Sequence, residues 1–330
     1  MGKLFDFFSG NNKAGKGITK KQVEFDKKLG FGFFFRLFKM RLGKFSVTNL
    51  AFTLCNIGII IALFGFTGML DSTVPTATDP LYGQISAASM NDASPVVSSL
   101  YGVFCASTGM KVTSIASKVL KCAMFTLFVT FGLATIGMVY NIRNVCTGEH
   151  IDTWQDFFYA IKRNFKQGIV ISIIDAILVF LLIYNIFAYR IEAANEFIFL
   201  VFYYASIVFA VVYYIMRFYV YLQLVTCEMS IWKLYKNALL LTALGIKRNL
   251  VCVIGTVVFA ILFAYTSILL PQFAIVALCI FVFAFLTYLG IYCAYPVFKL
   301  YVIDPYYDEH PEERPEDPWA TTESVFVDRG

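Results

Sequence analysis

Six apolar runs of about 20 residues each constrain this chain more than any other feature. They cover residues 46–69, 119–140, 168–188, 197–221, 250–270 and 274–297. A helix of about 20 apolar residues crosses the roughly 30 Å of hydrocarbon in a bilayer. Because backbone groups in lipid must be hydrogen-bonded within the segment, each run is expected to be a helix. The sequence therefore predicts an all-α membrane protein with six transmembrane helices.

The charge content points to the same class. Of 330 residues, 59% are hydrophobic and 15% are charged, whereas an ordinary soluble domain carries about 25% charged residues. The chain has 2 His, no zinc-binding motif, no Gly-rich phosphate loop and no Ser/His/Asp set. We therefore expect no catalytic residue, no cofactor and no metal, and we do not expect an enzyme.

The distribution of Lys and Arg predicts which segments face the cytoplasm. The first 45 residues hold 11 Lys and Arg but only 3 acids, which a cytoplasmic flank explains more simply than nucleic-acid binding does. The segments placed outside the cytoplasm, 70–118, 189–196 and 271–273, contain only three basic residues, namely Lys111, Lys118 and Arg190. Cytoplasmic loops carry an excess of basic residues, so both termini are expected in the cytoplasm. The predicted organisation is a basic segment 1–45, a transmembrane domain 46–297 with an outer loop 70–118, and an acidic cytoplasmic tail 298–330.

The outer loop, residues 70–118, is rich in Ser, Thr, Ala and Gly. Its residues 96–117 are apolar enough to form a short helix that rests on the membrane or on the helical bundle. A seventh span there is the alternative, but it would reverse the charge bias of every later segment.

Two predicted cytoplasmic segments resemble each other. Each begins with a Trp, at 154 and 232, continues as a short amphipathic helix, and reaches the same four residues, IKRN, at 161–164 and 246–249. Both copies then enter a predicted span from the same side. The pattern predicts two parallel units, 119–188 and 197–270, related by an axis near the membrane normal.

The amphipathic helices in these two segments combine aromatic and basic side chains. Such a helix lies in the headgroup layer, with its cations near anionic lipid headgroups. The alternative is a docking surface for a cytoplasmic partner. The residues that would carry either role are Trp154, Phe157, Phe158, Lys162, Arg163, Trp232, Lys236, Lys247 and Arg248.

Two blocks of the chain resemble the YesL family of bacterial membrane proteins. One is FFRLFKMRLGKFSVTNLAFTLCNI at 33–57, and the other is FGLATIGMVYNIRNVCTGEHIDTWQDFFYAIKRNFKQ at 131–167. The resemblance implies a multi-pass protein of the bacterial cell membrane with no established activity. It also implies subunits of ABC-type sugar importers as partners, because genes of the family often lie beside such importers. The long 70–118 loop departs from the family pattern, which has a short turn there.

Polar side chains inside the predicted spans are the remaining candidates for function. Asp175 is expected to be the only charged side chain deep in a span, and a buried carboxylate in lipid is costly. One interpretation is that Asp175, either neutral or paired, hydrogen-bonds a neighbouring helix and so holds the two helices together. The other is that it takes part in the movement of a proton or a solute. Asn49 and Asn56 are seven residues apart on the first run and are expected to share a face that hydrogen-bonds another helix.

Three functions are compatible with these features. The first is an accessory or regulatory membrane component, linked to a carbohydrate transport system, that docks a partner through the two amphipathic helices. The second is a small-solute or proton-linked transporter or channel, for which Asp175 and the repeat are the motivation. The third is a structural membrane bundle.

Overall fold

The computed structural model describes residues 30–75, 82–91, 94–100, 109–149, 151–194 and 196–313. The chain forms two compact units. The larger unit combines Met1–Cys55 with Phe128–Gly330, and the smaller unit is Asn56–Leu127. Apart from one short pair of strands in the smaller unit, the regular structure of the described residues is helical.

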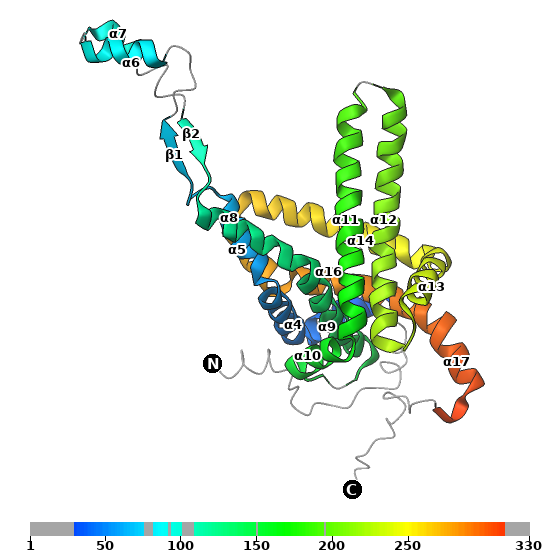
Figure 1. Ribbon diagram of the computed structural model, residues 1–330. Coiled ribbons are helices and arrows are strands. Elements are labelled where there is room, and N and C mark those ends of the chain that lie inside the picture. The colour runs from blue at the N-terminus through cyan, green and yellow to red at the C-terminus, as the bar shows by residue number, and fades with distance from the viewer. Residues whose placement is uncertain are drawn as a thin grey trace. The chain divides into compact units, whose positions relative to one another are not determined.

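The larger unit consists of helices of very different lengths (Figure 1). Its elements are α3 (Phe31–Met40), α4 (Leu42–Cys55), α9 (Leu127–Thr147), α10 (Thr153–Arg163), α11 (Phe165–Glu192), α12 (Phe197–Thr226), α13 (Ile231–Leu244), α14 (Ile246–Leu269), α15 (Pro271–Ala277), the π turn η3 (Leu278–Val282), α16 (Phe283–Phe298), the π turn η4 (Lys299–Ile303), α17 (Asp304–Glu309) and the 3₁₀ turn η5 (Pro311–Glu313).

Four helices are long and apolar enough to cross a membrane, namely Phe165–Glu192, Phe197–Thr226, Ile246–Leu269 and the continuous segment Pro271–Glu309. A fifth candidate arises if the bent pair Ile115–Thr126 and Phe128–Thr147 is counted as one span. The chain is thus a largely helical protein whose long apolar helices match four of the predicted runs. Large side chains on these helices are exposed, as with Phe187 (67%). Such surface suits lipid.

The first predicted run, 46–69, is not one helix. Helix α4 ends at Cys55 and α5 (Ile57–Phe66) begins two residues later, so the helix breaks at Asn56. Neither half is long enough to span a bilayer alone. The shared face of Asn49 and Asn56 presupposes one continuous helix, and with the interruption at Asn56 it stays a prediction.

The core of the larger unit lies where the C-terminal half of α12 meets α9, α10 and α16. The residues from Tyr219 to Val225 on α12 are all buried, and Tyr288 and Ile291 on α16 are fully enclosed. Helix α3 packs on α16 through Phe34, whose ring stacks on Tyr288 at a centroid distance of 4.6 Å. The Tyr288 hydroxyl also donates to the Phe34 carbonyl at 2.9 Å.

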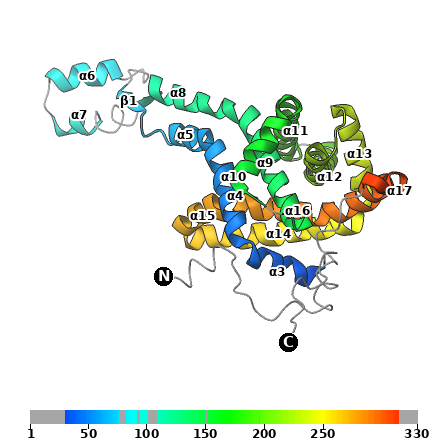
Figure 2. The same ribbon diagram turned by 90° about the horizontal axis from the view of Figure 1, so that it is seen from below.

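The helices of the larger unit do not form a set of parallel spans. Helices α11 and α12 run side by side as a hairpin, while α14 and α16 run across the direction of that hairpin (Figures 1 and 2). Helix α14 therefore does not follow the direction of α11. The parallel arrangement predicted from the two IKRN segments is not seen in these helices.

The smaller unit pairs α5 with α8 (Ile115–Cys122) and its continuation η2 (Ala123–Thr126). The Ser117 hydroxyl donates to the Gly65 carbonyl at 2.9 Å. A Cβ at Gly65 would lie 2.8 Å from that of Leu120, so only glycine allows this approach.

The remainder of the smaller unit corrects the predicted outer helix 96–117. Strand β1 (Ser72–Pro75) pairs antiparallel with β2 (Gly109–Val112), with Ser72 opposite Val112. Helices α6 (Tyr82–Asn91) and α7 (Pro95–Leu100) lie between them in sequence. A strand thus occupies part of the predicted helix, and residues 101–108 lie outside the described residues.

Candidate functional site

Asp175 on α11 is the centre of a buried polar cluster. It is 3% exposed, and its carboxylate accepts three hydrogen bonds from α12. Tyr213 donates to Oδ1 at 2.7 Å, while Arg217 and Tyr221 donate to Oδ2 at 2.7 Å and 3.0 Å. The three donors are spaced four residues apart, so they share one face of α12. This spacing aims all of them at one residue of the neighbouring helix.

Arg217 corrects the sequence analysis, which took Asp175 as the only charged side chain deep in a span. Arg217 lies within the run 197–221, and α12 continues to Thr226, which places the arginine nine residues before the helix end. Its Nη2 atom and the Asp175 carboxylate form a salt bridge of 2.7 Å. The signal available in the sequence was the Tyr-Arg-Tyr series at 213, 217 and 221.

The surroundings of the ion pair are aromatic. The Arg217 guanidinium lies 5.6 Å from the centroid of the Phe131 ring, and its Nε atom is buried without a partner among the described residues. The charge of the Asp175 carboxylate also affects Tyr235 on α13. Burial raises the pKa of Tyr235 to about 12, and the Asp175 carboxylate contributes to the rise. The cluster thus joins α11 to α12 and extends toward α13.

Asn49 joins α4 to the π turn η3. Its Nδ2 atom donates to the carbonyls of Leu278 and Cys279 at 3.0 Å and 2.7 Å, and its Oδ1 accepts from the Ala284 N–H at 2.8 Å. A π turn shifts hydrogen bonds from the i−4 to the i−5 carbonyl and leaves backbone groups beside it unpaired. Asn49 satisfies those groups, so the predicted helix-to-helix hydrogen bonding is present. Asn56 is buried at the break between α4 and α5.

Helix α10 divides its aromatic side chains between the interior and the surface. Phe157 is fully buried against Gly137, where a Cβ would lie 2.7 Å from the Phe157 ring. Trp154 and Phe158 are 40% and 42% exposed and stack at a centroid distance of 6.1 Å. Phe157 is therefore a core residue and does not belong to the surface that the sequence predicted. On α13, Trp232 is 80% exposed.

The predicted cations all lie at or near the surface. Lys162, Lys236, Lys247 and Arg248 are exposed. Arg163 has a defined role, because its Nη2 atom donates to the Val225 carbonyl near the end of α12. The last carbonyls of a helix lack partners within the helix, and a cation there also interacts favourably with the negative end of the helix dipole. Arg163 thus fixes the end of α12 against α10.

The two IKRN segments occupy different positions relative to their turns. Ile161 to Arg163 end α10 and Asn164 is the turn residue, whereas Ile246 to Asn249 begin α14 after the turn at Gly245. The two asparagines nevertheless bond similarly. Asn164 Nδ2 donates to the Ala160 carbonyl at 3.0 Å, and Asn249 Nδ2 donates to the Thr242 carbonyl at 2.8 Å. Each asparagine thus satisfies a carbonyl in the last turn of an amphipathic helix.

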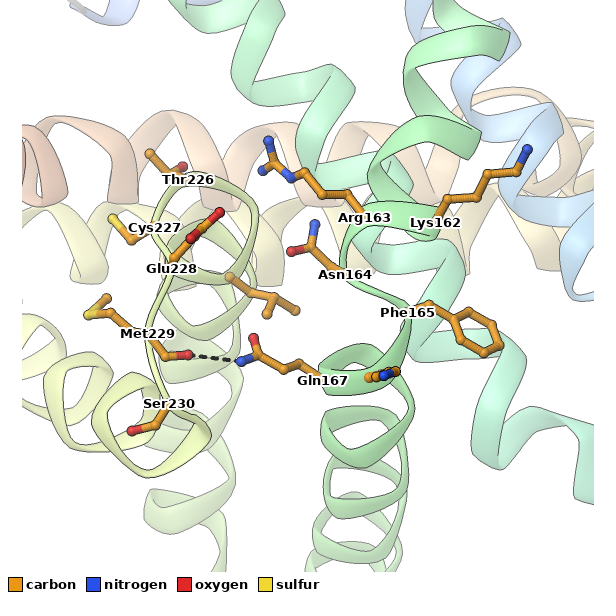
Figure 3. A pocket seen from close by; sticks show the side chains of 12 residues that line it. Lys162, Arg163, Asn164, Phe165, Gln167, Thr226, Cys227, Glu228, Met229 and Ser230 are labelled. Atoms are coloured by element: carbon orange, nitrogen blue, oxygen red, sulfur yellow. Dashed lines mark hydrogen bonds between the residues drawn. The ribbon is translucent and has the colours of Figure 1, made fainter.

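An open pocket of about 900 Å³ lies between the α10–α11 corner and the segment that joins α12 to α13 (Figure 3). Lys162, Arg163 and Lys166 line it on one side, and Thr226 to Ser230 line it on the other. Gln167 bridges the two sides through a 3.1 Å hydrogen bond from its Nε2 to the Met229 carbonyl. Lys162 and Arg163 are among the residues predicted from the sequence, whereas the pocket itself was not predicted.

Comparison with known proteins gives one match. Residues 117–186 match a family model described as a protein of unknown function, DUF624. The match contains the block 131–167 that carries the resemblance to YesL, together with α10 and Asp175, but it covers less than half of the chain. No curated protein and no solved structure matches the chain.

Proposed function

We propose that this chain is a non-enzymatic accessory or regulatory component of a membrane assembly, and that it docks a partner through α10 and α13. The observation that carries the proposal is the exposure of Trp154, Phe158 and Trp232 on two short helices that are too short to span a bilayer. Tryptophan is one of the residue types that most often anchor protein interfaces.

The topology that we propose with this function has six crossings in a bacterial cell membrane, with both termini in the cytoplasm. Helices α4 with α5, and α8 with α9, would supply the two crossings that no single long helix provides. The exposed Lys162, Lys247 and Arg248 would then lie on the cytoplasmic side, as the positive-inside rule expects.

The proposed repeat consists of α10 with α11 and α13 with α14. Each pair joins an exposed amphipathic helix to a long apolar helix, and each has an asparagine that bonds the last turn of the short helix. A partner would thus meet two similar basic and aromatic corners. The proposed partner class is a permease or ATPase subunit of an ABC-type sugar importer, and its support is the family resemblance alone.

The test is photo-crosslinking in native membranes. A photoreactive amino acid replaces Trp154 in one variant and Trp232 in another, and crosslinked proteins are identified by mass spectrometry. The matched control carries the same group at Tyr204, which is 59% exposed on the long helix α12. Crosslinks to one permease or ATPase from both tryptophan positions, and not from Tyr204, support the proposal. Crosslinks only to lipid or to other copies of the chain contradict it.

A transporter is the second candidate, because Asp175 and Arg217 form an ion pair within a long apolar helix pair. Intramembrane ionisable residues commonly mark solute or proton pathways. The test is proton and sugar flux into liposomes that contain the purified protein or its Asp175→Asn variant. Flux that the variant abolishes would favour transport over docking. If neither flux nor a partner is found, the third function, a structural bundle, is the one that remains.

A further inference from the structure

The pocket in Figure 3 lies at the polar ends of two long apolar helices. Helix α11 begins at Phe165 and α12 ends at Thr226, and both residues line the pocket. If these helices span the bilayer, their ends lie at the depth of the lipid headgroups, because the hydrocarbon core is about 30 Å thick. The pocket is therefore open to the layer that holds phosphate groups.

The electrostatics of the pocket favour an anion. Three cations, Lys162, Arg163 and Lys166, line it together with one acid, Glu228. Lys166 is in the first turn of α11, which has no acidic residue and no side-chain cap. The N-terminus of a helix carries a partial positive charge, so a lysine there adds to a field of the same sign. Lys162 and Lys166 form no ion pair within the described residues. An anion in the pocket would relieve this repulsion.

The walls of the pocket supply further groups that suit a phosphate ester. Arg163 is held in place by its bond to the Val225 carbonyl. The Thr226 hydroxyl oxygen is buried and has no hydrogen-bond partner in the described part of the chain. Figure 3 shows Arg163 and Thr226 on facing sides of the pocket, with Lys162 at the rim and pointing away from the α12–α13 segment. Met229 adds apolar surface.

We infer that this pocket binds the phosphate-bearing headgroup of an anionic phospholipid. Basic pockets between spanning helices on the cytoplasmic side are suited to such headgroups. Arg163 and Lys166 would contact the phosphate, Lys162 would add to its attraction from the rim, and Met229 would lie against the glycerol and upper acyl carbons. The inference does not depend on the docking of a protein partner, because it uses the α11–α12 ends and not the exposed tryptophans.

The test uses the full chain in nanodiscs of phosphatidylglycerol or phosphatidylcholine. Native mass spectrometry after transfer to detergent counts the retained lipids. Cys227 supplies a second readout, because it lines the pocket and is half-buried, whereas Cys122 is exposed elsewhere and serves as the reference for alkylation. The pocket variant is Lys162→Gln with Lys166→Gln. The matched control, Lys233→Gln with Lys236→Gln, removes the same charge from exposed sites on α13.

The expected result is retained phosphatidylglycerol, with alkylation of Cys227 slowed relative to Cys122. Each lost cation should lower the affinity about fivefold, so the pocket variant should lose on the order of twentyfold or more. The control variant should keep its lipid. Equal loss in both variants, or equal retention of the two lipids, would overturn the inference. Protection of Cys227 by millimolar inorganic phosphate in phosphatidylcholine nanodiscs would assign the site to free phosphate and overturn the lipid assignment.

Discussion

Asp175 and Arg217 lie 2.7 Å apart on neighbouring long helices, and Tyr213 and Tyr221 complete the coordination of the carboxylate. Removing two charges from water is costly, and the cost is recovered only when the pair is close and its other lone pairs are bonded. This cluster meets both conditions for the carboxylate. It acts as a specific polar joint between α11 and α12 in an otherwise apolar contact.

The first prediction concerns the two partners of this ion pair. Arg217→Gln leaves a carboxylate that is 4% exposed without its counter-charge, and it should lower the free energy of unfolding by about 3 kcal/mol. Asp175→Asn should cost less, because the guanidinium is 21% exposed and the amide oxygen still accepts a hydrogen bond. The double variant should be more stable than the sum of the single costs implies. SDS titration in mixed micelles measures the free energy of unfolding of all three variants. If the loss in the double variant equals the sum of the two single losses, Asp175 and Arg217 do not stabilise the protein as a pair.

The second prediction separates the tyrosines that surround Asp175. Tyr221→Phe removes one hydrogen bond to a charged group and should cost about 1.5–3 kcal/mol in the same assay. Tyr213→Phe should cost a similar amount, because its hydroxyl bonds the other carboxylate oxygen. Tyr204→Phe is the control, since that residue is 59% exposed. A loss of equal size at position 204 would show that the effect belongs to the helix surface and not to the cluster.

The third prediction concerns Asn49. Asn49→Leu would leave the carbonyls of Leu278 and Cys279 and the N–H of Ala284 without this partner. Buried backbone groups that lose their partners are costly, so unfolding should become easier by about 2–4 kcal/mol. Thr53→Ala is the control, because the Thr53 hydroxyl bonds only a carbonyl of its own helix. If the two variants are equally stable, Asn49 does not hold the π turn.

The fourth prediction uses two glycines of the spans. A Cβ at Gly132 would collide with the Ser172 hydroxyl and lie 2.7 Å from the Ser172 Cα, so α9 and α11 would have to move apart. At Gly255 the nearest atoms are the methyl carbons of Leu289, at 3.0 Å and 3.3 Å, and a leucine side chain can shift. Gly132→Ala should therefore lower the midpoint of thermal unfolding in detergent by several degrees, and Gly255→Ala should change it little. The reverse order would contradict the close packing of α9 on α11.

The fifth prediction concerns the pH dependence of Cys227, which follows the end of α12. Burial raises the pKa of the Cys227 thiol above its ordinary value, and the nearby Arg143 offsets part of the rise. Only the thiolate is alkylated rapidly. The rate for the folded protein should therefore stay low at neutral pH and still be rising above about pH 9. A peptide that contains Cys227 should level off at lower pH, and coincident profiles would show that the thiol is not buried.

The sequence predicted the long apolar helices well, because the period and length of an apolar run depend on local residues alone. The runs 168–188 and 197–221 each fall within one long helix, and the run 250–270 ends one residue beyond α14. The break at Asn56 was missed, since no Pro or Gly occupies that position and the surrounding residues favour a continuous helix. The steep crossing of α14 and α11 was also missed, because it depends on packing between distant segments such as α14 and α16.

The polar contacts were predicted by residue type but not by partner. Asn49 was expected to bond another helix, and it does, but a π turn at 278–282 has no clear signature in the sequence. Arg217 was overlooked although its spacing from Tyr213 and Tyr221 was available. Phe157 and Phe158 are adjacent, but Phe157 shares the buried face of α10 with Thr153 and Ala160 and packs on Gly137, whereas Phe158 is exposed.

The contact between Asn49 and the π turn also bears on the synthesis of the chain. Its three backbone partners are 229, 230 and 235 residues further along. Until the chain has been synthesised as far as Ala284, the Asn49 amide lacks these partners, and a buried polar group without hydrogen bonds is costly. A product cut short before Leu278 keeps this defect permanently. Helix α4 thus carries a buried side-chain amide whose partners are supplied only when η3 and the start of α16 have been added to the chain.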